Sequence, residues 1–121
     1  MPPVQFIVYS GTKIILMDFS DAKTTAEIVQ TVEEIKKFVE IHQPQSLLVL
    51  LDVTKIQLNK KRIRIIQGMA AHNRPYIRRI ALVGLRFPKS VTFWLRFWFT
   101  GKINHRVFGT REKGLEWLAK V

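Results

Sequence analysis

The first forty residues change from an alternating pattern to a helical one. Two β-rich runs, Val4–Tyr9 and Lys13–Phe19, are separated by the short turn Ser10-Gly11-Thr12. Such a pair of runs around a glycine turn predicts an antiparallel hairpin. Thr24 and Glu27 then match a capping box. Apolar residues at helical spacing follow as far as His42 and predict an amphipathic helix: Ile28, Val32, Ile35, Phe38 and Val39.

The middle of the chain contains two apolar runs that read as buried strands. Ser46–Val53 (SLLVLLDV) has no alternation, which is typical of a strand covered on both faces. We expect it to be the central strand, reached through a right-handed crossover. Asn59 can cap a second helix, whose inner face is Ile63, Ile66, Met69 and Ala70. Ile80–Gly84 (IALVG) is the second buried strand.

An unusually aromatic stretch comes next. Pro88 and Gly101 bound a predicted helix over Lys89–Thr100. On a helical wheel its apolar side chains fill an arc of roughly 200°, wider than one supporting sheet covers. They are Val91, Trp94, Leu95, Phe97, Trp98 and Phe99, and Phe93 extends the arc further. The neighbouring cations are Arg86, Lys89, Arg96, Lys102 and Arg106.

The end of the chain predicts one more strand and one more helix. The strand is Arg106–Gly109, and the helix starts near Thr110 and carries Leu115, Trp117 and Leu118. The predicted order is therefore β-β-α-β-α-β-α-β-α. With no repeat or linker, residues 1–121 form a single α/β domain whose sheet is mostly parallel after the hairpin.

Charge is distributed very unevenly along the chain. Residues 1–54 carry a net charge of −3 and residues 55–121 a net charge of +14, which gives +11 in total. So basic a half-chain suggests an anionic partner, either nucleic acid or lipid headgroups. The plainer alternative is that the charge serves solubility alone.

No catalytic or metal-binding signature is found in the sequence. There are no cysteines, and the three histidines lack partners at ligand spacing. His42 and His72 fall in last helical turns, where an imidazolium can face terminal carbonyls. Asp18 and Asp52 both end strands and could be neighbours, but aspartate after a strand is also a common turn former. We expect no enzymatic activity, no cofactor and no metal.

The element order and three phrases of the sequence resemble the SpoIIAA-like family, relatives of the STAS domains of anti-sigma-factor antagonists and anion-transporter tails. The phrases are SLLVLLDVT at 46–54, HNRPYIRRIALVG at 72–84 and RVFGTREKGLEWL at 106–118. The resemblance implies a SpoIIAA-like, STAS-related α/β fold with a mixed, mostly parallel sheet. The SpoIIAA-like group also resembles CRAL-TRIO lipid carriers in fold, which implies membrane association or binding of an apolar ligand.

One departure from the STAS pattern concerns regulation. STAS antagonists carry a phosphorylated Ser or Thr at the start of the helix after the central strand. Residues 57–61 of this chain read QLNKK, without a hydroxyl at that turn. The corresponding loop residues are Asp52, Thr54, Asn59 and Lys60. The departure argues against a phosphorylation switch at the helix start, although Thr54 carries a hydroxyl nearer the strand end.

Three functions stay open at this point. The first is reversible association with an anionic membrane surface, or sheltering of an apolar ligand, through residues 89–100. Phe93, Trp94, Phe97 and Trp98 would insert, and the flanking cations would hold headgroups. The second is a protein-interaction regulator whose same helix docks a partner or a second copy, its rings being core or dimer contacts. The third, which is weaker, is nucleic-acid binding by the basic half. We expect a cytoplasmic protein, with peripheral association at the inner membrane face under the first reading; no segment reaches the length needed to span a bilayer.

Overall fold

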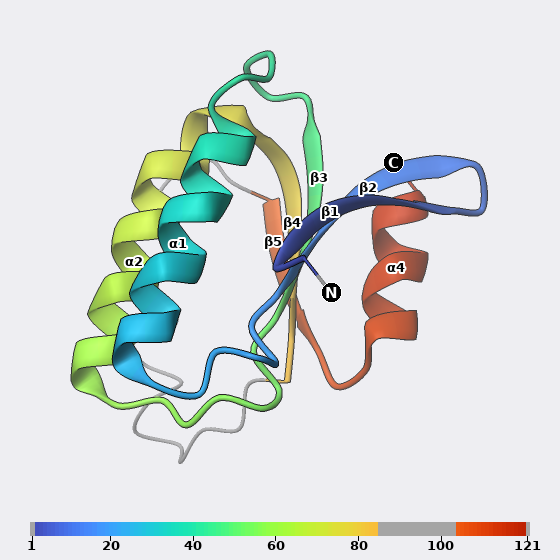
Figure 1. Ribbon diagram of the computed structural model, residues 1–121. Helices are drawn as coiled ribbons and strands as arrows, with labels where there is room; N and C mark the ends of the chain where they lie inside the picture. The colour runs from blue at the N-terminus through green and yellow to red at the C-terminus, as the bar shows by residue number, and fades with distance from the viewer. Residues whose placement is uncertain (1, 85–103, 121) are drawn as a thin grey trace.

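The strands form one twisted sheet with helices on both of its faces (Figure 1). The computed structural model describes residues 2–84 and 104–120, and its sheet order is β1-β2-β3-β4-β5. β2 pairs antiparallel with β1, while β3, β4 and β5 continue parallel to β2. The strands are β1 (Val4–Tyr9), β2 (Thr12–Asp18), β3 (Leu47–Asp52), β4 (Ile77–Val83) and β5 (Asn104–Phe108). The predicted hairpin and mostly parallel sheet are confirmed.

The hairpin turn between β1 and β2 has only two residues, Ser10 and Gly11. Their φ angles are 48° and 76°, and they lie between the paired residues Tyr9 and Thr12. Positive φ at both central positions defines the turn whose twist suits a two-residue hairpin, and glycine adopts it without steric cost.

The helices are distributed unequally over the two faces of the sheet. α1 (Thr25–Val39) and α2 (Lys60–Asn73) cover one face, and α4 (Arg111–Ala119) covers the other (Figure 1). Each start is capped by the residue that precedes the helix. Thr24 and Glu27 form the predicted capping box, with both hydrogen bonds at 3.1 Å. The side chain of Asn59 accepts from the amide of Arg62 at 2.9 Å, which confirms the second predicted cap.

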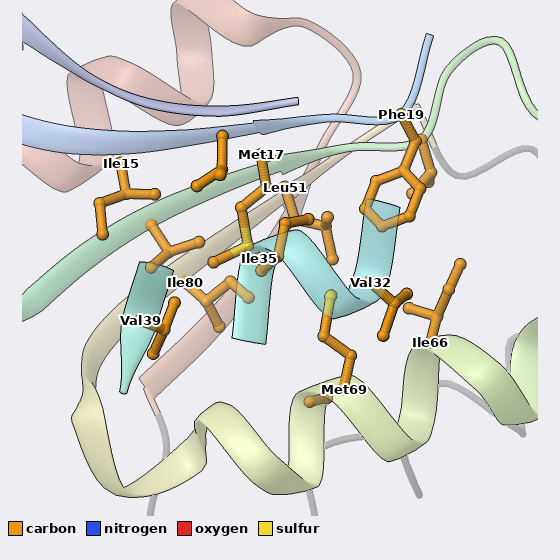
Figure 2. Close-up of a cluster of buried hydrophobic side chains, with 14 of the residues drawn as sticks. Ile15, Met17, Phe19, Val32, Ile35, Val39, Leu51, Ile66, Met69 and Ile80 are labelled. Atoms are coloured by element: carbon orange, nitrogen blue, oxygen red, sulfur yellow. The ribbon is translucent and has the colours of Figure 1, made fainter. Parts of the chain in front are cut away.

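The larger core lies between the sheet and the helix pair α1 and α2 (Figure 2). Strand residues such as Ile15 and Leu51 meet Ile35 of α1 and Met69 of α2 there. A smaller core under α4 contains Leu50, Ala81 and Leu118. β3 contributes to both cores, as its continuous apolar sequence predicted.

Two predicted boundaries were wrong by a few residues. β4 begins at Ile77 rather than Ile80, because Arg79 is part of the strand and stacks on α4. Its guanidinium lies 4.9 Å from the centroid of the Trp117 ring and donates to the Trp117 carbonyl at 3.4 Å. β5 runs from Asn104 to Phe108 rather than from Arg106 to Gly109. The helix predicted over Lys89–Thr100 lies outside the described residues.

In the described part of the chain, no helix is long and apolar enough to cross a bilayer.

Candidate functional site: the carboxyl edge of the sheet

The edge at which the parallel strands end brings together the loops that the sequence singled out. α1, α2 and α4 all begin there, near the lower end of the sheet in the view of Figure 1. Asp18, the last residue of β2, is the register partner of Asp52, the last residue of β3. The two carboxylates are therefore neighbours, as their positions after adjacent strands suggested.

Both aspartates act as turn formers. Asp18 Oδ1 accepts a hydrogen bond from the Ser20 amide at 2.9 Å, and Asp52 Oδ1 accepts one from the Thr54 amide, also at 2.9 Å. The Thr54 hydroxyl donates to the same oxygen of Asp52. These are the local bonds by which Asp stabilises a turn two residues ahead.

The second oxygen of each aspartate is bound by one arginine, Arg111. Its Nη2 lies 3.1 Å from Asp18 Oδ2, and its Nε donates to Asp52 Oδ2. The side chains of Asp18 and Asp52 are 11% and 9% exposed, whereas that of Arg111 is 40% exposed. A guanidinium suits this role because its donors form a planar fork that can serve two acceptors. We call Asp18, Asp52 and Arg111 the clamp.

The contacts within the clamp shift the pKa of two of its members, Asp18 and Arg111. Burial acts to raise the pKa of Asp18, but hydrogen bonds from Ser20 and the contact with Arg111 outweigh it, so this pKa lies below its usual value. Burial acts to lower the pKa of Arg111, yet its bonds to Asp52 and Asp18 raise it. Asp18 and Arg111 are therefore both charged at neutral pH, and their bonds are charge-assisted.

The clamp fastens α4 to the sheet. Arg111 is the first residue of α4, whereas its partners end two strands from the opposite half of the sequence. The sequence analysis missed Arg111. The sequence does contain a signal for Arg111, because this residue follows the cap Thr110 at the start of a helix. A helix that follows a parallel strand begins close to the carboxyl ends of the strands.

Thr54 also contacts Gly84, which follows β4. Gly84 has φ +81°, and a Cβ atom there would lie 2.0 Å from Thr54 Oγ1 and 2.5 Å from Thr54 Cα. Only glycine allows both this backbone angle and this close approach. The end of β4 therefore lies directly beside the loop that follows β3.

That loop and the start of α2 form a basic surface. Between residues 54 and 64 the only charged side chains are cationic. The exposed ones, which we call the basic edge, are Lys55, Lys60, Lys61 and Arg64. Arg62 does not belong to the basic edge, because it is half-buried and its guanidinium is bound within the protein. Its Nε donates to Thr25 Oγ1 at 3.1 Å and its Nη1 to the Gln57 carbonyl at 2.8 Å. The first turn of α2 contains no acidic residue, so these cations oppose the helix dipole.

The other side of the same edge is acidic. A groove of about 210 Å³ lies beside Asp18, between the N-terminal residues and α1. Its charged lining residues are Asp18, Asp21, Glu27 and Glu34. The carboxyl edge is therefore polarised, with negative charge near β2 and α1 and positive charge near α2.

The predicted loop residues meet at this edge, whereas the predicted insertion residues cannot be placed. Asp52, Thr54, Asn59 and Lys60 all lie there. Arg106 lies elsewhere, exposed on β5, with Ala81 as its register partner. The others lie outside the described residues: Arg86, Lys89, Phe93, Trp94, Arg96, Phe97, Trp98 and Lys102.

The two helical histidines differ from each other. His42 Nδ1 lies 3.3 Å from the Val39 carbonyl, as predicted for a helix end. His72 instead contacts side chains, with Nε2 3.1 Å from Glu40 and Nδ1 3.0 Å from Asn73. The expectation of a carbonyl contact for His72 was therefore wrong, because α1 ends beside α2. Over residues 2–84 and 104–120, no group of three or more His, Asp or Glu is placed to hold a metal ion.

Comparison with known proteins identifies a solved structure with a similar fold. No family model and no curated protein sequence match the chain. A solved structure matches it with a TM-score of 0.68 at 13% identity, over 95% of this chain and 91% of the other. That structure is an uncharacterised protein of the DUF3478 family from Shewanella loihica PV-4 with a SpoIIAA-like fold. The chain therefore has a SpoIIAA-like, STAS-like fold, and the resemblance seen in its sequence is confirmed at the level of the fold.

Proposed function

We propose that this chain is a non-catalytic STAS-like module that associates reversibly with an anionic membrane surface. The observation that carries the proposal is the position of the basic edge. Lys55 follows Thr54, which contacts Gly84, and the sequence after Gly84 continues into the aromatic stretch 89–100. The aromatic stretch therefore begins only a few residues along the chain from Gly84, which lies beside the basic edge. Aromatic residues close to exposed cations are typical of interfacial binding.

The charges are sufficient for reversible attraction. Each Lys or Arg near an anionic leaflet contributes about 1 kcal/mol, so the basic edge contributes up to about 4 kcal/mol before salt screening. The acidic groove near α1 is repelled by the same leaflet, and this polarity orients the carboxyl edge with its α2 side toward the lipid. Aromatic insertion adds the apolar part of the binding energy.

The absence of catalysis is part of the proposal and is supported by the contacts of the clamp. A carboxylate pair that does acid–base work needs one member with a raised pKa and free access to substrate. Here the pKa of Asp18 is lowered, and both aspartates are occupied by turn amides and by Arg111. These contacts support a structural role.

Sedimentation with vesicles tests the proposal. We expect binding to phosphatidylserine-containing vesicles and little binding to pure phosphatidylcholine. Removing two cations with Lys60→Gln/Lys61→Gln takes away about 2 kcal/mol, or roughly thirtyfold in affinity at low salt, and less at physiological salt. Phe97→Asp should abolish the insertion part at every salt concentration.

A charge-matched control separates a local effect from net charge. Lys36→Gln/Lys37→Gln removes the same charge from the last turn of α1, at the opposite edge of the sheet, and should change affinity only slightly. Equal binding to anionic and neutral vesicles contradicts the proposal. So does an equal effect of the two double variants, because binding would then depend on net charge and not on the basic edge.

A second candidate function is protein interaction through the loop before α2. Thr54 and Lys60 are exposed, and STAS antagonists present the corresponding loop to a partner kinase. The helix start lacks the hydroxyl that such a kinase modifies, so this function would need a partner that reads the loop without phosphorylation. Retained vesicle binding by the Lys60→Gln/Lys61→Gln variant, with loss of a captured protein partner, favours this function.

A further inference from the structure

In the sheet formed by the described residues, β1 (Val4–Tyr9) is an edge strand, and it carries no charge. Its sequence is VQFIVY, in a chain whose net charge is +11. Terminal strands usually carry charged residues or proline, which prevent pairing with another chain. Pro2 and Pro3 precede β1, but nothing of this kind protects the strand itself.

The free backbone groups of β1 can be assigned from its pairing with β2. The Asp18 amide donates to the Pro3 carbonyl at 2.8 Å, so the carbonyl of residue 3 faces β2. Because antiparallel pairing alternates, residues 5, 7 and 9 also face β2, whereas Val4, Phe6 and Val8 direct their amides and carbonyls outward. In the described part of the chain these outward groups have no hydrogen-bond partner.

Apolar side chains accompany this open edge. Val8 is 73% exposed and Ile41 is 80% exposed. Ile41 lies close to β1, because the ring of His42, next to Ile41, is 5.4 Å from that of Phe6, centroid to centroid. Phe6 also packs on Phe38, at 5.3 Å, so this part of β1 is held rigidly against α1. A rigid strand loses little conformational freedom when it pairs.

We propose that β1 is a self-association surface on which the β1 of a second copy pairs antiparallel. A twofold axis at Phe6 places Phe6 opposite its symmetry mate and Val4 opposite Val8, so the outward amides and carbonyls of all three residues are satisfied at once. One continuous sheet then runs through both copies.

A second copy fits this edge because its own uncharged β1 is self-complementary in the pairing about Phe6. Each copy has a net charge of +11, so a stable contact between copies needs a surface free of cations. Among the described residues β1 provides such a surface, apart from Lys13 of β2, whose Nζ lies 4.1 Å from the Phe6 ring centroid. β5, the other edge strand of the described sheet, carries the exposed Arg106. Pairing of two β5 strands would therefore bring like charges together.

The oligomeric state in solution tests this surface. We expect sedimentation equilibrium of the full chain to show a concentration-dependent dimer of the 14.1 kDa monomer. Val8→Lys should weaken the dimer at least about tenfold, because a lysine on an edge strand opposes pairing and the dimer contains the change twice. Val107→Lys is the matched control. It adds the same charge at an exposed position, 48% accessible, on β5, and should leave the dimer unchanged.

Amide hydrogen exchange of the wild-type chain reads the surface without any substitution. The amides of Val4, Phe6 and Val8 should become protected as protein concentration rises, while those of β5 should not change. Dimerisation should strengthen with added salt, which screens repulsion between two cationic copies, whereas vesicle binding weakens. This opposite response keeps the dimer distinguishable from the proposed membrane function.

Three results would each overturn the proposal: a monomer at every concentration, a dimer that Val107→Lys weakens as much as Val8→Lys, or concentration-dependent protection that omits β1. If the wild-type chain is monomeric but an added extended peptide protects the β1 amides, the edge takes a different partner and self-association is rejected.

Discussion

Replacing Arg111 by methionine removes the clamp between α4 and the strands β2 and β3. Methionine keeps the length and apolar stem of the side chain, so the change isolates the guanidinium. Asp18 keeps its bond from the Ser20 amide and Asp52 keeps its bonds from Thr54. Both carboxylates nevertheless lose their cationic partner while they remain nearly buried.

The free energy of unfolding lost in Arg111→Met lies between two limits. Breaking a fully buried ion pair costs about 3–5 kcal/mol, and an exposed pair is worth about 0.2–1 kcal/mol. Arg111 is 40% exposed and its partners are about a tenth exposed, so the clamp falls between these limits. We expect Arg111→Met to lower the free energy of unfolding by about 2 kcal/mol at pH 7, close to the value of one hydrogen bond to a charged group.

Urea unfolding followed by circular dichroism measures this loss. The midpoint should fall with an unchanged slope, and the melting temperature should fall by roughly 6–10 °C for a chain of this length. Arg111→Lys should lie in between, because an ammonium group does not reproduce the fork that serves both aspartates. As pH falls through the lowered pKa of Asp18, the difference between wild type and Arg111→Met should shrink, since protonated Asp18 no longer needs a cation.

Lys113→Met is the matched control, because Lys113 is an exposed cation two residues further along α4. Its removal should leave stability nearly unchanged or raise it slightly, since a cation near a helix start opposes the dipole. If Arg111→Met costs less than about 0.5 kcal/mol, or no more than Lys113→Met, the clamp does not hold α4 and the reasoning above is refuted.

Thermal unfolding should show that Gly84→Ala destabilises the fold by more than about 2 kcal/mol, because the new Cβ would overlap Thr54. Gly11→Ala should cost about 1 kcal/mol in the same assay, because Gly11 has a similar φ of 76° but open space around it. Asn59→Ala should cost about 1 kcal/mol in the same assay, and Asn59→Asp should retain the cap. The lowered pKa of Asp18 contributes stability above its ordinary value of 3.8 and loses it as pH falls through the folded pKa; Asp18→Asn should therefore flatten the acid limb of a stability–pH curve.

Local patterns predicted most of the architecture because the forces that create them are local. The capping box at Thr24, the cap at Asn59 and the unbroken apolar run of β3 each carry their own structural signal. The start of β4 was missed because Arg78 and Arg79 look like loop residues. Arg79 belongs to the strand because Trp117, far along the chain, covers its guanidinium.

The candidate site was predicted only where the position of a residue in its own strand or helix already indicates its neighbours in space. The position of Asp18 and Asp52 after adjacent strands indicated their pairing. Arg111 has no such pattern, since its role depends on a distance of 59 residues to Asp52 and on which face of the sheet α4 covers. The basic edge was visible as a charge run, but its proximity to Gly84 required the register of β3 and β4.

The proposed antiparallel pairing of two β1 strands has a consequence for a dimer that binds lipid. A twofold axis across β1 turns the strands of the second copy around, so the two carboxyl edges point away from each other. Such a dimer does not gain avidity on one bilayer. It joins two bilayers, and turbidity of an anionic vesicle suspension should rise with wild-type protein but not with Val8→Lys.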